Sequence, residues 1–341
     1  MTDLAKKFEL HIPVETDEGN AVDLLVVACD LSKQRIKQAM KNGSVWLTHD
    51  EHTSRLRRAK RLLKKGDELH FYFDETIQAE VSKTPELIAD EGNYSVFFKP
   101  QGMYSQGSKW GDQCTINRWV EQEMDRPAFV VHRLDRAASG LMLIAHTKTA
   151  AAALSKLFEE RQIEKRYRAR VTGLFEPATV VLDNDIEGRK AKSLVTLLEY
   201  DQANDCSLLE INIETGRKHQ IRRHLSEAGY PIIGDRLYGK SDKETQESEE
   251  SQQPDLQLVA TELSFVAPDT SKRSKPVKPK ENIWKTSNTK ELDISEQAEL
   301  NPDAASDTAA TKNYSVPNRL LAPELCKPAA KESSDRIWPG Q

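Results

Sequence analysis

The segment VVHRLDRAASGLMLIAHTK, residues 130–148, is apolar at both ends and charged in the middle. The apolar ends are typical of buried strands. Between them stand His132, Arg133, Asp135 and Arg136. An isolated aspartate in such a place is most often a turn residue. The alternative is that two strands hold one carboxylate among cations, and the rest of the sequence decides between these interpretations.

The bulk composition indicates more than one domain. The 341 residues suffice for two domains and a tail. Only 38% of the residues are hydrophobic, which is low for one compact globule, so some segment adds length without adding core. The net charge of −5 does not by itself indicate a nucleic-acid binder, and the distribution of charge is therefore more informative than its sum.

The cysteines and the first residues predict a cytoplasmic protein without a metal site. No cysteine lies near another in the sequence, so there is no zinc-ligand spacing. The four are Cys29, Cys114, Cys206 and Cys326. The opening residues MTDLAKKFEL lack the apolar core of a signal peptide, and no stretch approaches the length of a membrane span. We therefore expect a reducing, cytoplasmic environment and no contact with a membrane.

Residues 1–75 are predicted to form a small first domain that binds RNA. Residues 8–14 alternate like a strand, Ser32 is an expected helix N-cap, and Gly43 follows that helix at a turn. From residue 33 to residue 65 the chain has eleven Lys or Arg and only two acids. A charge run is usually a solvated face, but an excess of one sign favours phosphate binding. The candidate contacts on the helix are Lys33, Arg35, Lys37 and Lys41.

The remainder divides into a short linker, a larger unit and a polar tail. The linker covers residues 76–87. Residues 88–270 contain many strand patterns and few helices, which predicts a β-rich domain. A polar insertion at 240–254 interrupts this domain, and residues 271–341 are rich in Ser, Thr, Pro and charge. Because such a segment buries too little apolar surface to offset its ordering entropy, we expect a disordered tail.

Four motifs follow one another in the larger unit. They are FFKPQGM at 97–103, HRLDRAASGLML at 132–143, EKRYRARVTG at 164–173 and ETGRKHQIRRHLSEAGYPIIGDRLYG at 214–239. Each resembles a motif of the RluA family of RNA pseudouridine synthases, and their order is the order of that family. In front of them, LSKQRIKQAMKNGSVWL and LLKKGDELHFYF resemble the alpha-L RNA-binding domain, over residues 17–74.

The resemblance implies an α+β fold. The catalytic domain is expected to have a mixed, largely antiparallel sheet, preceded by a small α/β RNA-binding domain. The implied activity is that of an isomerase converting a uridine of structured RNA to pseudouridine. The expected substrate is large-subunit (23S) rRNA, and tRNA is the second choice. The reaction gains and loses no atom, so no cofactor is expected; RNA is the expected partner, and a monomer is the expected state. The alternative from another class is a non-catalytic RNA-binding protein of the same fold.

The same resemblance assigns roles to residues of these motifs. Asp135 matches the catalytic aspartate, and Arg222 matches the arginine that pairs with it. Tyr167 matches the tyrosine that stacks on the uracil and is a candidate for removing the C5 proton. Arg133 matches the arginine beside the flipped nucleotide, because a base inside a helix cannot be reached. The further RNA-binding candidates in these motifs are Arg136 and Arg217.

Several other polar residues of the motifs are expected to be structural. Lys99 is interpreted as a solvated strand end, and His132 and His219 as local hydrogen-bonding residues. A metalloenzyme using His132, His219 and His224 would lack an acidic ligand set at metal spacing, so no metal is expected.

The sequence departs from the family pattern at two positions. Ala138 replaces the usual threonine, so a hydroxyl near the aspartate is missing. Val259 stands where the family generally has histidine. Because Asp135, Tyr167 and Arg222 all remain, these departures bear on substrate and rate more than on the type of reaction.

Overall fold

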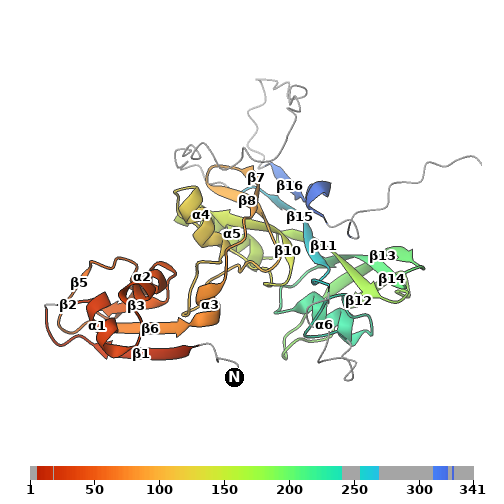
Figure 1. The fold of residues 1–341 in the computed structure, drawn as a ribbon. Helices are drawn as coiled ribbons and strands as arrows, with labels where there is room; N and C mark the ends of the chain where they lie inside the picture. Colours follow the sequence, from red (N-terminus) through yellow and green to blue (C-terminus); the bar gives the residue numbers. More distant parts are fainter. Residues whose placement is uncertain (1–5, 18, 240–253, 269–309, 322–324, 326–341) are drawn as a thin grey trace, which may run out of the picture.

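The computed structural model describes residues 6–17, 19–239, 254–268, 310–321 and 325. Two bodies lie side by side, and helix α3 (Glu75–Ala79) leads from the first to the second (Figure 1). We call residues 6–74 the N-terminal unit. The predicted insertion at 240–254, apart from its last residue, and most of the predicted tail lie outside the described residues.

The N-terminal unit is a four-stranded antiparallel sheet with two helices. The strand order is β1-β6-β3-β4, and a short β2-β5 pair lies apart from it. The elements are β1 (Lys7–Pro13), β2 (Gly19–Asn20), α1 (Ala21–Ala28), α2 (Lys33–Lys41), β3 (Val45–His49), β4 (His52–Arg55), β5 (Leu62–Leu63) and β6 (Glu68–Asp74). Leu25 from α1, Ile36 from α2 and Phe71 from β6 are fully buried in one core. The unit therefore has its own hydrophobic centre.

Helix α2 begins and ends where the sequence predicts. The Ser32 Oγ accepts a hydrogen bond from the Arg35 N–H at 3.3 Å, which satisfies a free donor of the first turn. Asn42 closes the helix, and Gly43 follows at φ +83°, a left-handed conformation that favours glycine. The basic side chains of the helix therefore project from a capped, regular element.

The larger body is one ten-stranded sheet, in the order β12-β13-β14-β11-β15-β10-β8-β7, with β16 beside β15 and β9 beside β10. Its strands are β7 (Glu86–Asp90), β8 (Tyr94–Lys99), β9 (Phe129–Val130), β10 (Ser139–Ala145), β11 (Glu164–Thr172), β12 (Thr179–Leu182), β13 (Ser193–Asp201), β14 (Cys206–Ile213), β15 (Leu258–Val266) and β16 (Thr311–Ser315). Among the strands that the structure describes, β10 and β15 form the one parallel pair. The expectation of a mixed, largely antiparallel sheet is confirmed.

Three helices accompany this sheet. They are α4 (Ile116–Glu123), α5 (Lys148–Glu159) and α6 (Gln220–Glu227). Helix α5 packs on β10 through Ala150 and Leu154, both fully buried. The segment predicted as a linker, residues 76–87, contains most of α3 and the first two residues of β7.

The parallel junction of β10 and β15 requires a glycine. Gly140 has φ +124°, and a Cβ there would lie 2.4 Å from the backbone N of Ala260. Ser139 and Gly140 pair with Val259 and Ala260, while β11 pairs with the other side of β15. This order puts the loop that enters β10 close to the middle of β11.

Part of the predicted disordered tail is folded. Residues 311–315 form β16, which pairs antiparallel with the second half of β15. Tyr314 is buried, and its hydroxyl donates to Glu91 at 2.9 Å and lies 3.1 Å from the Tyr94 hydroxyl. Lys312 also pairs with Glu91, at 2.8 Å. The expectation failed here because a few apolar residues suffice when an existing core and a free strand edge receive them.

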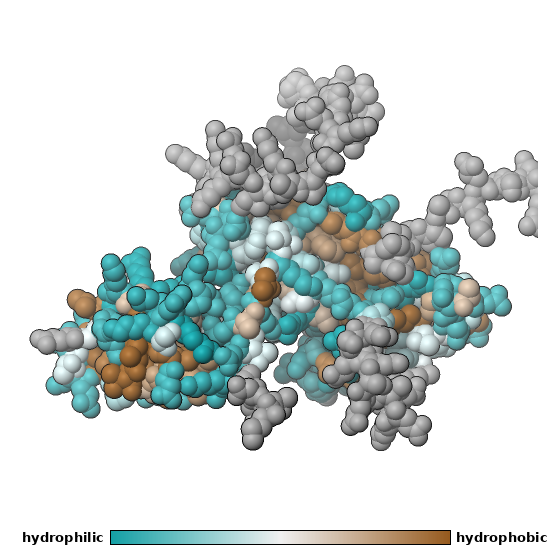
Figure 2. Space-filling view, viewed as in Figure 1, coloured by the Kyte–Doolittle hydropathy of each residue, from teal (hydrophilic) through white to brown (hydrophobic). Residues whose placement is uncertain are grey.

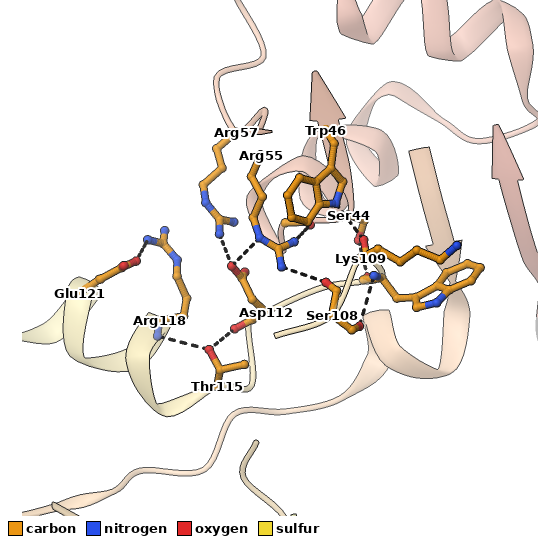
Figure 3. Close-up of polar contacts among 12 residues, drawn as sticks. Ser44, Trp46, Arg55, Arg57, Ser108, Lys109, Asp112, Thr115, Arg118 and Glu121 are labelled. Carbon is orange, nitrogen blue, oxygen red and sulfur yellow. Dashed lines mark hydrogen bonds and ion pairs between the residues drawn. The ribbon is translucent and has the colours of Figure 1, made fainter. Parts of the chain in front are cut away.

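The N-terminal unit contacts the larger body through residues 104–112, which we call the docking loop. Arg55 and Arg57 both pair with Asp112, with the Arg55 Nε 3.1 Å from its carboxylate (Figure 3). The Trp46 ring lies over the Arg55 guanidinium, 4.2 Å from its carbon. Figure 3 shows the two arginines converging on Asp112 at the entrance to α4.

Backbone groups complete this contact. The Trp46 indole N–H donates to the Lys109 carbonyl at 3.0 Å, and the Ser44 hydroxyl donates to the Trp110 carbonyl at 2.8 Å. The Asp112 N–H donates to the Asn42 carbonyl at 2.9 Å. Hydrogen bonds to main-chain groups fix both distance and orientation, so the loop holds the end of α2 in a defined place.

The surface of the face in view is mostly hydrophilic. Figure 2 shows hydrophobic residues gathered over the N-terminal unit and beside β15 and β11, with hydrophilic residues elsewhere. No helix among the described residues is both long and apolar enough to cross a membrane.

Candidate active site

Asp135 lies in the loop that enters β10, at the wall of a cleft. Its side chain is 26% exposed. One carboxylate oxygen is 3.4 Å from an Arg222 terminal nitrogen, and the other is 3.7 Å from the His219 Nε2. A partly exposed carboxylate with two neighbouring cationic or hydrogen-bonding groups is oriented and still open to a ligand. The expected neighbourhood of Asp135 and Arg222 is therefore present.

Arg222 is held mainly by another carboxylate. Its Nε and one terminal nitrogen donate to Asp235 at 2.8 and 2.6 Å, a bidentate pair of two buried side chains. Burial by itself would lower the pKa of Arg222, but its hydrogen bonds and charges from Asp235 and Asp135 raise it. The remaining terminal nitrogen is free to reach Asp135. Sequence reasoning missed Asp235, although it stands in the GDRLYG part of the fourth motif.

His219 adds a second contact that sequence reasoning missed. It begins α6 with a left-handed backbone, φ +55°, and its Nδ1 lies 2.9 Å from the Tyr238 hydroxyl. That bond directs the Nε2 toward Asp135. Burial lowers the pKa of His219, while Asp135 acts in the opposite direction. The unusual backbone of His219 gave no signal in the sequence.

Tyr167 faces Asp135 across a small cavity of about 100 Å³ that both residues line. It comes from the middle of β11, where β15 brings it next to the loop entering β10. Burial, assisted by the negative charge of Asp135, raises the pKa of Tyr167 far above its usual range. The side chain is thus a neutral phenol at physiological pH, which suits stacking against a base.

Lys99 is not the solvated strand end that the sequence suggested. It is fully buried, and its ammonium donates to the carbonyls of Pro100, Met103 and Ala138 at 3.1, 3.0 and 2.6 Å. Burial lowers the pKa of Lys99 to about 7, while Asp135 acts to raise it. Three acceptors match the three donors of an ammonium, so the charged form is fully hydrogen-bonded. Lys99 therefore ties β8 to the loop that carries Asp135.

Three neighbouring cavities make the cleft, with volumes of about 590, 100 and 380 Å³. Arg133 lines all three, and its side chain is exposed. Asp135 lines the first two, and Tyr167 lines the last two. Because they share walls, the cavities form one channel with Asp135 and Tyr167 near its middle.

The other predicted RNA contacts fall into two places. Arg217 lines the two smaller cavities, and Arg136 lines the largest. Arg136 is engaged, however: it pairs with Glu80 at 2.8 Å and lies over the Tyr104 ring at 4.5 Å. The remaining four, Lys33, Arg35, Lys37 and Lys41, are exposed on α2, outside the residues that line these cavities.

Two cations of α2 are not free. Lys33 pairs with Asp23 at 2.8 Å, and Arg35 pairs with Glu75. Both pairs are exposed and contribute little to stability, so an RNA phosphate competes for these side chains at small cost.

The histidines considered as metal ligands have other contacts. His132 is structural, as expected: its Nε2 accepts from the Leu143 N–H at 2.9 Å, and burial lowers its pKa to about 3. His224 lies 3.0 Å from both the Ser193 hydroxyl and the Asn184 carbonyl. In the described part of the chain, the one group with metal-ligand geometry is His11, Glu68 and His70, on the N-terminal sheet.

The two departures from the family pattern are both buried. Ala138 lines the small cavity beside Tyr167, so a threonine there would fill part of that space. Val259 packs in the core of the sheet and pairs with Ser139 across the parallel junction. A histidine at this position would put a polar ring into apolar surroundings.

Known proteins resemble this chain over the larger body. The family model described as RNA pseudouridylate synthase matches residues 93–227. A protein of Aquifex aeolicus (strain VF5), named uncharacterized RNA pseudouridine synthase, is 30% identical over 257 residues, covering 67% of this chain and 80% of that protein.

Two further relatives have more specific names. The ribosomal large subunit pseudouridine synthase C of Buchnera aphidicola subsp. Schizaphis graminum is 28% identical, over 57% of this chain and 67% of that protein. The dual-specificity RNA pseudouridine synthase RluA of Vibrio parahaemolyticus is 29% identical, over 54% of this chain and 78% of that protein. With relatives of this identity and coverage, and with the four motifs meeting at one cleft, the chain belongs to the RluA family of RNA pseudouridine synthases.

Proposed function

We propose that the protein isomerises a uridine of large-subunit rRNA, with Asp135, Tyr167 and Arg222 as the catalytic set. The observation that carries the site assignment is the shared small cavity, where Asp135 and Tyr167 face each other and Arg222 contacts the carboxylate. A non-catalytic RNA-binding protein would have no need of this arrangement.

The chemistry requires little more than positioning. The bond from uracil N1 to the ribose C1′ breaks, C5 bonds to C1′, a proton leaves C5 and N1 gains one. No atom is gained or lost, so the proposed reaction uses no cofactor. Asp135 acts on the base or on the ribosyl centre, and Arg222 orients its carboxylate. The high pKa of Tyr167 favours stacking on the flipped uracil over removal of the C5 proton as its role.

The N-terminal unit supports rRNA as the substrate. Its α2 carries four exposed Lys or Arg side chains, and the docking loop holds the end of this helix against the larger body. A docked basic helix extends the phosphate-binding surface beyond the cleft, which suits a large structured RNA. The relative named as a large-subunit synthase favours the same substrate, and the dual-specificity relative makes tRNA the second candidate. We further propose a monomer that works in the cytoplasm.

The substrate is tested by tritium release from RNA labelled at uridine C5. Ribosomal and transfer RNA fractions, prepared from cells that lack this protein, are incubated with it separately, and the modified site is then mapped. We expect release from the large-subunit rRNA at a single uridine. Release from the tRNA fraction alone would reject the rRNA assignment, and release from neither would reject the activity.

The docking loop provides a second prediction. Replacement Asp112→Ala leaves Arg55 and Arg57 adjacent and without their shared carboxylate, so we expect the N-terminal unit to detach from the loop. Affinity for the structured rRNA should fall about tenfold, because α2 then no longer has a fixed position relative to the larger body. Filter binding measures the affinity, and hydrogen exchange at residues 104–112 measures the detachment.

The matched control is Glu15→Gln, an exposed residue of the same unit. It should change neither quantity. Unchanged exchange and affinity in Asp112→Ala would show that the two arginines do not hold the unit in place.

A further inference from the structure

The third cavity of the cleft, of about 380 Å³, has no role in the isomerisation described so far. It lies between the end of α5, the start of β11 and the residues that follow β14. Tyr167, Arg133 and Arg217 line both this cavity and the small one beside Asp135. A ligand seated on Tyr167 therefore has a direct continuation into it.

The walls of this cavity are strongly basic. Four cations line it, and the two carboxylates that line it are Glu159 and Glu214. Glu214 is neutralised by Lys192 at 2.6 Å. The four cations are Arg133, Arg161, Lys165 and Arg217. The cavity thus keeps an excess of positive charge, which attracts an anion.

Most of these cations have no protein partner. Within the described ranges, no hydrogen bond or ion pair is made by the side chains of Arg133, Arg161 or Lys165. Among the described residues, the Arg217 side chain donates only to the Lys190 carbonyl, at 3.0 Å. Surface arginines often lack partners, so the exposed Arg133 and Arg161 by themselves are weak evidence for an anion site.

Lys165 is the exception, because it is buried. Only 9% of the residue is exposed, and it still faces the cavity. Burial lowers the pKa of Lys165, and the charge of Arg161 lowers it further. A buried ammonium without a partner is costly, and a bound anion would offset that cost.

Strand geometry places Lys165 in register with the reaction. Residues two apart on a strand point to the same face, so Lys165 and Tyr167 stand side by side on β11, about 7 Å apart along the strand. Neighbouring phosphates of the substrate strand must pass close to the nucleotide that Tyr167 contacts.

We propose that this cavity binds a backbone phosphate of the RNA next to the flipped uridine, with Lys165 as its buried cation and Arg161 and Arg217 at its rim. This inference rests on the proposed role of Tyr167 at the base. Lysine binds phosphate as a point charge through charge-assisted hydrogen bonds. The subsite would hold the strand in position while the base rotates between N1 and C5.

The variant Lys165→Met tests the subsite, because it keeps the unbranched side chain except for its terminal nitrogen and removes its charge. We expect the Kd for 5-tritiated rRNA to rise about tenfold. The slope of log Kd against log KCl concentration should become shallower by about 0.7, the contribution of one single-strand phosphate contact. Lys165→Arg should restore most of the affinity. The control is Lys156→Met on α5, an exposed lysine that pairs with Glu160 at 3.7 Å and should leave both quantities unchanged.

A second variant protects the test against misfolding. Arg161 is exposed and has a left-handed backbone at φ +59°, a conformation that asparagine tolerates, so Arg161→Asn should fold normally. It should also make the salt dependence shallower. If both variants keep the wild-type Kd and slope while the wild-type protein releases tritium, the phosphate subsite is wrong and the isomerase stands. If the wild-type protein releases no tritium, the proposed isomerase function is rejected, and the subsite proposal that rests on it is rejected with it.

Discussion

Asp135→Asn should abolish tritium release from C5-labelled RNA while RNA binding remains nearly intact. Asparagine has the shape of aspartate and cannot carry its negative charge, so it neither attacks nor stabilises the ribosyl centre. Loss of a residue that acts directly in the chemistry lowers turnover by roughly 10⁴-fold or more. Single-turnover tritium release with excess enzyme measures the rate, and filter binding measures the affinity.

The surroundings of Asp135 indicate that this variant folds. Arg222 keeps its bidentate contact with Asp235, and Lys99 bonds to main-chain carbonyls that the replacement does not alter. The control is Asp125→Asn, an exposed aspartate with φ +52°, a conformation that asparagine also adopts. Turnover by Asp135→Asn at the wild-type rate would remove Asp135 from the mechanism.

Asp235→Ala should produce the largest loss of stability among changes at the cleft. It removes the two short hydrogen bonds of Arg222, whose side chain is only 5% exposed. It also removes the acceptor of the Leu237 and Tyr238 N–H groups, at 3.0 and 3.1 Å. Breaking a buried ion pair from one side costs about 3–5 kcal/mol, because the remaining charge stays buried; Arg222 would keep only its longer contact with Asp135, at 3.4 Å. Urea unfolding at pH 7 measures this loss.

The pH dependence gives a sharper test of the same pair. Burial acts to raise the pKa of Asp235, but hydrogen bonds from Arg222, Leu237 and Tyr238 lower it below its ordinary value of 3.8. A carboxylate with a lowered pKa stabilises the fold above the ordinary value, and this contribution is lost as the pH falls through the lowered one. The difference in unfolding free energy between wild type and Asp235→Ala should therefore be constant above about pH 5 and shrink in stronger acid.

The control for this pair is Asp183→Ala, which changes an exposed aspartate. It should leave the urea midpoint of the wild-type protein unchanged, both at pH 7 and in stronger acid. We expect Asp235 to be a positioning residue, so a folded Asp235→Asn variant should lose turnover more than RNA affinity. A variant with wild-type stability and turnover would show that Asp235 does not hold Arg222 in place.

The sequence predicted the elements that depend on local patterns. The Ser32 cap, the Gly43 turn and the alternation of β11 are set within a few residues, so spacing alone located them. The four motifs also indicated the family, because residues at fixed spacings are a property of the chain itself.

The tail shows where local composition misleads. Residues 311–315 lack the apolar content of an independent strand, yet Tyr314 is buried and the strand pairs with β15. These residues form a strand because a free edge of β15 and a core made by residues far away in the sequence receive them. No window of sequence contains that information.

Lys99, His219 and Asp235 make the same point at the cleft. Each was assigned no role in catalysis from its sequence position, and each is now seen to hold Asp135, its loop or Arg222. Their partners are distant in the sequence or lie in other segments, and the folded chain brings them together. The sequence by itself determined the motifs and the carboxylate at their centre. Tertiary structure decided which charges surround Asp135 and which of them are buried, because burial and pairing are properties of packed neighbours rather than of spacing.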